Sequence, residues 1–169
     1  KKSVIVIYGP PGAGKTTLAD LLHGELSHSA HIGVDHIKRF ISEFREIKSH
    51  QEVSKSVINV MIDEYLRNNI SVIVEQGISN EEIKKLKEIA DINNADFFVY
   101  RLEASNEVLD ERVGERATQL GKPTIPRETI DELRKTFREN DYPSTKVFDS
   151  GNVSTKEISD SILSTLQVS

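Results

Sequence analysis

One stretch near the amino terminus combines glycines, a lysine and a threonine at a spacing that suits phosphate capture. Residues 9–16, GPPGAGKT, fit the pattern G-x-x-x-x-G-K-[ST], the Walker A motif or phosphate loop. Its glycines can adopt positive φ and expose successive backbone N–H groups to an anion. We expect Lys15 to reach the β- and γ-phosphates of a nucleotide and the Thr16 hydroxyl to ligate Mg²⁺. The nucleotide-binding residues predicted here are Gly9, Pro10, Pro11, Gly12, Ala13, Gly14, Lys15, Thr16 and Thr17.

The segments on either side of this loop agree with that interpretation. The β-branched run at residues 3–8, SVIVIY, is typical of a strand buried on both faces. The helix predicted after it begins near Gly14 and runs to Leu26, so its unpaired N–H groups and positive dipole end point at the loop. The alternative is a glycine-rich turn without a ligand. A strand before the loop and a helix after it favour phosphate binding.

Composition narrows the class of protein. A chain of 169 residues with 37% hydrophobic and 29% charged residues is typical of one globular domain. The lack of cysteine excludes disulfides and thiolate metal sites and suits a reducing cytoplasm. Lys1 and Lys2 lead straight into the first predicted strand, and no apolar run approaches membrane-spanning length. We therefore expect no signal peptide, no membrane span and a cytoplasmic location. The net charge of −5 argues against a broad nucleic-acid-binding face.

Apolar strands alternate with helical patterns along the whole chain. Strands are predicted at residues 3–8, 29–34, 71–75, 97–102 and 146–149, and helices at about 14–26, 36–44, 51–68, 79–92, 105–118, 127–138 and 156–166. Ser79 with Glu82, and Ser154 with Glu157, form capping boxes that begin two of these helices. Alternation of this kind predicts a five-stranded parallel sheet covered by helices on both faces, an α/β fold with three layers.

Two of the predicted helices carry apolar stripes that should face the core. In the first, at 36–44, the stripe is Ile37, Phe40, Ile41 and Phe44. In the second, at 51–68, it is Val53, Val57, Val60, Met61, Tyr65 and Leu66.

From Val4 to Leu166, in element order and motif placement, the chain resembles the small P-loop kinases. These include AAA_33 and zeta-toxin-like proteins, shikimate and gluconate kinases, and chloramphenicol phosphotransferase. The resemblance implies a P-loop NTPase fold in a single domain over residues 1–169, with a short lid at about 112–127. It also implies an ATP- and Mg²⁺-dependent phosphotransferase that moves the γ-phosphate to a hydroxyl, or a phosphate, of a small molecule.

The acceptor side of the predicted site begins at Asp35, after the second strand. Ligands of open parallel sheets bind beyond the carboxyl ends of the strands, so Asp35 and the phosphate loop should open onto one crevice. Asp35 could accept the proton of an attacking hydroxyl and hold it in line with the γ-phosphate. The alternative is a helix N-cap. Arg39, one helical turn later, could clamp an anionic or hydroxyl-rich acceptor or pair with Glu43 at the surface.

Glu75 and Gln76 follow the third strand and resemble the acidic turn that zeta-toxin-like kinases use against the acceptor. We predict substrate contact for both residues. Glu75 could instead reach a metal-bound water, or simply end the strand in solvent. No code for a particular acceptor is evident between His36 and Lys55.

Arginines around the predicted loop at 119–126 resemble the lid of this family. Arg116 is expected to stabilise the transferred phosphoryl group, and Arg112 and Arg127 to close over the nucleotide, because planar guanidinium groups meet phosphate oxygens bidentately. Because Glu111 and Glu115 intersperse this pair, Arg116 could also simply be solvated. The family places adenine beside the turn that holds Gly151 and Asn152. Two further arginines, Arg134 and Arg138, fit a solvated face, and His31 is expected to pack near the second strand.

Three other functions would use the same loop. A GTPase switch would need an Asn-Lys-x-Asp motif, which the chain lacks, and a motor would need a strand ending in Asp-Glu and a further helical domain. A 5′-hydroxyl polynucleotide kinase would need a cationic track for the strand, which the net charge disfavours.

Overall fold

A computed structural model describes residues 1–169 except 45, 76–78, 122–125, 140, 144 and 169. Its centre is a five-stranded sheet in the order β2-β3-β1-β4-β5, and every neighbouring pair is parallel. The strands are β1 (Ser3–Tyr8), β2 (Ser29–Gly33), β3 (Ser71–Glu75), β4 (Asp96–Glu103) and β5 (Lys146–Asp149). The predicted α/β class and parallel sheet are confirmed. Among the described residues, no helix combines the length and apolarity needed to cross a membrane.

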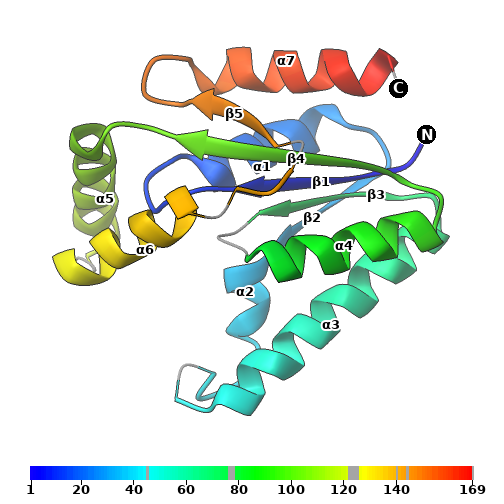
Figure 1. Cartoon of the computed structure of the whole chain (residues 1–169), viewed down its shortest axis with the longest axis horizontal. Coiled ribbons are helices and arrows are strands. Elements are labelled where there is room, and N and C mark those ends of the chain that lie inside the picture. Colours follow the sequence, from blue (N-terminus) through cyan, green and yellow to red (C-terminus); the bar gives the residue numbers. More distant parts are fainter. Residues whose placement is uncertain (45, 76–78, 122–125, 140, 144, 169) are drawn as a thin grey trace.

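Helices cover both faces of this sheet (Figure 1). They are α1 (Lys15–Glu25), α2 (Val34–Lys38), α3 (Lys48–Arg67), α4 (Asn80–Ile92), α5 (Asn106–Leu120), α6 (Arg127–Glu139) and α7 (Thr155–Val168). The helices α1 and α7 lie on one face and α3 and α4 on the other, while α5 and α6 lie beyond the carboxyl ends of the strands. Both chain ends lie at the opposite edge (Figure 1). This arrangement gives the three layers expected from the sequence.

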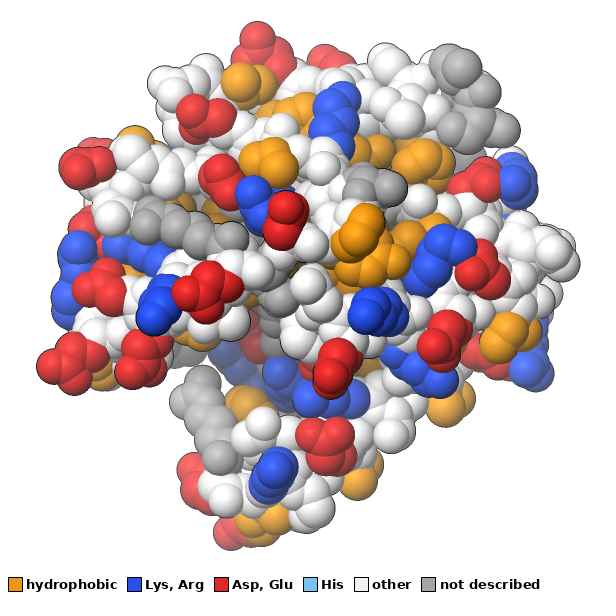
Figure 2. Space-filling model, in the orientation of Figure 1, with side chains coloured by type: hydrophobic (Ala, Val, Ile, Leu, Met, Phe, Trp, Pro, Cys, Tyr) orange, Lys and Arg blue, Asp and Glu red, His pale blue; other side chains and the backbone are white. Residues whose placement is uncertain are grey.

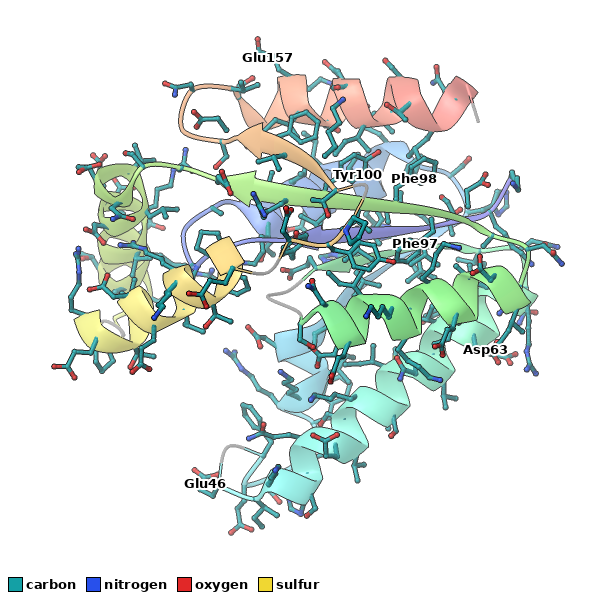
Figure 3. All side chains as sticks on the ribbon, viewed as in Figure 1. Glu46, Asp63, Phe97, Phe98, Tyr100 and Glu157 are labelled. Atoms are coloured by element: carbon teal, nitrogen blue, oxygen red, sulfur yellow. The ribbon has the colours of Figure 1, made fainter. Side chains whose placement is uncertain are left out.

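Strand alternation divides the apolar residues between two cores. Val4, Val6 and Tyr8 of β1 face the core under α3 and α4, whereas Ile5 and Ile7 face the core under α1 and α7. All of β1 is buried because both faces are covered. On β4, Phe97 points toward the α4 side while Phe98 and Tyr100 point toward α7 (Figure 3). Burial raises the pKa of Tyr100 to about 12.

Both predicted capping boxes are present. The Ser79 backbone N–H donates to Glu82 Oε2 at 2.8 Å, and the Glu82 N–H donates to Ser79 Oγ at 3.3 Å. Ser154 and Glu157 exchange the matching bonds at 3.0 and 3.3 Å. These bonds satisfy backbone donors that the first turn of a helix leaves without partners, and they set where α4 and α7 begin.

The helix predicted at 36–44 was wrong in length. The regular helix α2 ends at Lys38, and the chain continues through bonds from Arg39 N–H to His36 O and from Phe40 N–H to Ile37 O, at 3.2 and 3.0 Å. These i→i+3 bonds are those of a tightening 3₁₀-type turn. Glu43 follows with φ of +55°, and Phe40, which the predicted stripe placed in the core, is 70% exposed.

The face predicted for α3 was also wrong in part. The buried residues are Ser54, Ile58, Ile62 and Leu66, and the valines of the predicted stripe, Val53, Val57 and Val60, are exposed. Apolar residues occur on two sides of this helix, and the larger isoleucines form the core contact. Ser54 is tolerated inside because its hydroxyl donates to His50 O at 2.9 Å.

Candidate nucleotide and acceptor site

The phosphate loop connects β1 to α1 through a backbone that only glycine can follow. Gly9 and Gly12 have φ of +151° and +85°. An added Cβ would lie 2.4 Å from Leu102 O at Gly9 and 2.8 Å from Leu109 O at Gly12. The loop is therefore packed against β4 and α5 by close backbone approach. Gly14, the N-cap of α1, also has positive φ, and no side chain caps the helix there. The first N–H groups of α1 thus have no side-chain cap from Gly14, the arrangement that suits an anion.

Lys15 and Thr16 occupy the first turn of α1, as the motif requires. Lys15 Nζ donates to Pro10 O at 3.1 Å. Burial lowers the pKa of Lys15, and the negative charges of Glu75 and Asp35 oppose this effect, whereas Arg116 adds to it. Lys15 thus lies within electrostatic reach of the two carboxylates and of one arginine predicted for the site.

Glu75 lies at the end of β3 directly beside Thr16. The Thr16 hydroxyl donates to Glu75 Oε1 at 3.2 Å. On the neighbouring strand, Gly33 leaves room for this carboxylate, because a Cβ there would stand 3.2 Å from Glu75 Oε1. Gln76, also predicted to contact substrate, lies outside the described residues.

His31 on β2 links Glu75 to α1. Its Nδ1 lies 3.1 Å from Asp20 Oδ1, and its Nε2 lies 3.8 Å from Glu75 Oε1, which is an ion-pair contact rather than a hydrogen bond. The pKa of His31 is raised, first by Glu75 and then, against the effect of burial, by Asp20. The expectation that His31 packs near the second strand agrees with its place, and its two carboxylate neighbours were not foreseen.

Asp35 and Arg39 line one cavity of about 180 Å³. Asp35 lies in the first turn of α2 and is not its N-cap, which is Gly33. Arg39 forms no ion pair within the described part of the chain, so the predicted alternative pair with Glu43 is not formed. The other lining residues are Lys38, Phe44 and Gln51.

A second cavity, of about 290 Å³, lies between α3 and α4, next to Val34 of α2 and Val74 of β3. Lys55 is one of its lining residues and lies 3.3 Å from both Glu52 and Glu82, which also line it. These three charged side chains are thus engaged with one another.

Arg112 joins three parts of the nucleotide side. From α5, its Nη1 donates to Gly12 O and to Ser150 Oγ, both at 3.3 Å, and its Nη2 donates to Ser150 O at 2.7 Å. Arg112 therefore holds α5 against both the phosphate loop and the turn after β5. That turn is tied internally, because Asp149 accepts from Asn152 Nδ2 at 2.7 Å and from Gly151 N–H at 2.9 Å. These bonds, with Asn152 the larger cause, lower the pKa of Asp149.

The remaining arginines of the predicted lid differ in their surroundings. Arg116 is exposed and forms no ion pair among the described residues. Arg127 is engaged by Asp110 at 2.5 Å and by Asp131 at 3.4 Å.

Arg134 is a correction, because it is not solvated. It is 3% exposed, and its Nη2 donates to Asp110 Oδ1 at 2.9 Å. Arg134 first and Arg127 second lower the pKa of Asp110. Arg134 falls between Ile130 and Phe137 on the apolar stripe of α6, so the periodicity could have indicated its burial. Nothing is described of the side chain of Arg138.

Lys38 is the cavity residue that the sequence analysis did not assign. It lies three positions after Asp35, so both can occupy one side of a helical turn. The spacing could therefore have indicated that Lys38 lies on the same side as Asp35. Gln51 and Phe44 come from the start of α3 and the segment before it, and their meeting with α2 depends on the unforeseen end of that helix.

The residues present fit a nucleoside triphosphate with Mg²⁺. Backbone N–H groups, the half-buried Lys15 and the Thr16 hydroxyl would provide donors and one metal ligand at the start of α1, and Glu75 has an oxygen next to that hydroxyl. Among the described residues there is no cluster of three or more acidic or histidine side chains that could hold a metal unaided.

Comparison with known proteins agrees with this arrangement. The family model AAA_33, described as an AAA domain, matches residues 4–140. No curated protein matches the sequence significantly.

Solved structures share the fold at low identity. A provisionally assigned kinase from Chloroflexus aurantiacus J-10-fl has a TM-score of 0.77 and 18% identity, over 99% of this chain and 97% of its own. An unliganded sugar kinase from Janibacter sp. HTCC2649 has a TM-score of 0.76 and 18% identity, over 100% of this chain and 96% of the kinase chain. Thymidylate kinase from Candida albicans has a TM-score of 0.62 and 14% identity, over 99% and 92%. The match to the family model shows that the chain is a P-loop nucleotide-binding domain and belongs to the AAA_33 family.

Proposed function

We propose that this protein is an ATP- and Mg²⁺-dependent phosphotransferase that moves the γ-phosphoryl group to a hydroxyl of a small molecule. One observation carries the proposal. Asp35 lines a cavity and also acts electrostatically on Lys15 of the phosphate loop. A carboxylate between a phosphate site and a cavity is what transfer to an alcohol requires. A regulatory or motor ATPase needs no such cavity.

In this mechanism the chain positions the reactants and manages one proton. The loop N–H groups and Lys15 bind the β- and γ-oxygens, and Asp35 holds the acceptor hydroxyl in line with the γ-phosphorus. As the acceptor oxygen bonds to phosphorus, the bond from phosphorus to the β–γ bridging oxygen breaks. The hydroxyl proton passes to the Asp35 carboxylate, and ADP leaves. Mg²⁺, when bound, neutralises charge on the β- and γ-oxygens.

Glu75 fits the metal side better than the acceptor side in this scheme. Its carboxylate is 3.2 Å from the Thr16 hydroxyl, the predicted metal ligand. We therefore assign Glu75 to a metal-bound water, the alternative to the substrate contact predicted from the sequence. His31 holds the carboxylate from the other side.

We propose that α5 and α6 form the lid of the site. Arg112 already bridges α5 to Gly12 O and Ser150, which supports a place for α5 over the nucleotide. Arg116 acts on Lys15 electrostatically and is the arginine best suited to meet charge on the transferred group. Arg127 would have to leave Asp110 to reach a nucleotide.

An ADP-release assay tests this proposal. The protein is mixed with Mg·ATP and separately with sugars, nucleosides, nucleotides, antibiotics or short oligonucleotides. ADP release should exceed the rate in water with one class of acceptor and fall in Asp35→Asn. An equal rate with every compound and with water alone would indicate an ATPase and overturn the proposal. A response confined to oligonucleotides, with steep salt dependence, would indicate a polynucleotide kinase.

A further inference from the structure

We propose that the acceptor carries an anionic group besides its reacting hydroxyl, and that Lys38 and Arg39 bind that group. This inference rests on the proposed function. It names Lys38 as a residue that determines acceptor specificity, and the acceptor class as small hydroxy acids or polyol monophosphates.

The charges of the cavity are the first reason. Lys38 and Arg39 are consecutive, both line the cavity of Asp35, and neither forms an ion pair with any described residue. Several cations elsewhere lie within 4 Å of a carboxylate, namely Lys55, Arg67, Lys85, Lys87 and Lys156. Others, such as Lys48, Lys84 and Arg116, have no ion pair among the described residues, but they do not share one cavity with a neighbouring cation. Figure 2 shows Lys and Arg side chains gathered over α2, in the notch between the α5–α6 end and the start of α3. An anionic ligand would supply the missing counter-charge.

The spacing along α2 is the second reason. Asp35 lies at the start of this short helix, and Lys38 and Arg39 lie at its end. Three to four residues of helix correspond to about 4.5–6 Å. A hydroxyl at Asp35 and an anion at the cations would then be separated by only a few bonds, as they are in a hydroxy acid or a polyol phosphate.

The size of the cavity is the third reason. Its volume of about 180 Å³ is below the roughly 300–1,000 Å³ of sites for drug-sized ligands. At about 30 Å³ for each water-sized group, it holds about six such groups. Phe44 offers an apolar wall and Gln51 an amide for further hydroxyls. This favours a small polyhydroxy anion over a nucleotide or an antibiotic.

Binding measurements test the inference without any need for turnover. The protein is first saturated with Mg·ADP, so that the phosphate loop is filled, and is then titrated calorimetrically. The probes are glycerol and erythritol, each compared with its aldonate and its monophosphate. We expect at least one anionic member to bind about tenfold or more tightly than its neutral parent. The advantage should shrink as salt is added.

Substitutions test whether Lys38 and Arg39 are responsible for the tighter binding of the anionic probes. The double variant Lys38→Gln with Arg39→Gln should reduce the anionic advantage to about twofold or less and leave the weak affinity for the neutral parent unchanged. Lys84→Gln, an exposed lysine of α4 outside both cavities, should retain the full advantage. Equal affinity for both members of every pair, or no binding by any anionic member, would overturn the inference, as would an advantage that survives the double variant.

The same probes in the ADP-release assay separate this inference from the proposed function. Anions that bind through Lys38 and Arg39 but release no ADP would support the inference and count against phosphotransfer. Faster ADP release with a neutral polyol than with its anionic forms would support phosphotransfer and overturn the inference.

Discussion

The two sides of the candidate site are built by different means. The phosphate loop is made mostly of backbone, and its shape depends on glycines that approach Leu102 O and Leu109 O too closely for any side chain. The acceptor wall is made of side chains from the short helix α2, the segment after it and the start of α3. Backbone geometry serves any triphosphate, whereas side chains can be exchanged to suit a new acceptor. We infer that local sequence fixes nucleotide binding, and that acceptor choice lies in the side chains of α2, Phe44 and the start of α3.

The largest effect is expected from Lys15→Ala. The variant should lose at least about 10²-fold in ATP affinity, because a charged hydrogen-bond donor to the phosphates is removed, and turnover should fall to background. Calorimetry with Mg·ATP measures the affinity. The melting temperature should not fall, because burial disfavours the charged form of Lys15 in the folded protein. Unchanged ATP affinity would place the nucleotide elsewhere.

Asp35→Asn tests the acceptor side. Turnover should fall by about 10³-fold because the variant cannot accept the hydroxyl proton. ATP affinity should stay within about twofold of the unmodified protein, since Asp35 is assigned no contact with the nucleotide. Single-turnover kinetics and calorimetry measure the two quantities. Unchanged turnover would remove Asp35 from the mechanism.

Arg116→Ala tests whether this arginine of the proposed lid binds ATP in the ground state or acts only during phosphoryl transfer. We expect kcat to fall by about 10²-fold and ATP affinity to change little, because this arginine is assigned to charge that develops on the transferred group. Arg67→Ala, at the far end of α3, is a matched control, since Arg67 pairs only with Asp63 among the described residues. Equal losses in rate and affinity would indicate simple ATP binding.

Adjacent residues of α3 test which face of this helix packs in the core. Ile58→Ala should cost about 2–5 kcal/mol in the free energy of unfolding, because Ile58 is 5% exposed in the core. Val57→Ala should change it by no more than about 0.5 kcal/mol, because Val57 is 42% exposed. Urea unfolding measures both. The reverse order would restore the stripe predicted from the sequence.

The smallest effect concerns His31, which lies between Asp20 of α1 and Glu75 of β3 on the nucleotide side. Its folded pKa is raised above the ordinary 6.5, so its stabilisation is complete below that pH and is lost as pH rises through the folded pKa. The melting temperature of the unmodified protein, relative to His31→Gln, should decline by about 1–2 °C above pH 6.5. A difference independent of pH would show that these carboxylates do not stabilise the protonated ring.

The fold and the loop could be predicted because both depend on local patterns. The β-branched runs specify strands, and β1, β3 and β5 begin and end at the predicted residues. GPPGAGKT specifies its own backbone. The acceptor wall could not be predicted in the same way, because the helical spacing of apolar residues continues to Phe44 although α2 ends at Lys38, and because tertiary packing selects the buried face of α3. On α3, both sides are apolar, and only contact with the sheet selects Ile58 and Ile62 over Val57 and Val60.

Arg134 shows the same limit in the lid. Charge suggested solvent, yet its periodicity placed it with Ile130 and Phe137. Arg134 can be buried because Asp110 on another helix accepts its hydrogen bond. Local sequence around Arg134 does not indicate such a partner.

The double engagement of Asp110 has a mechanical consequence. A single carboxylate on α5 accepts from both Arg127 and Arg134 of α6, so neither helix can tilt alone without breaking a charged hydrogen bond. The helices α5 and α6 should therefore move together as one rigid unit. Arg112 connects this unit to the phosphate loop through its hydrogen bond to Gly12 O. Amide protons along both helices would then become accessible to solvent in a single cooperative opening.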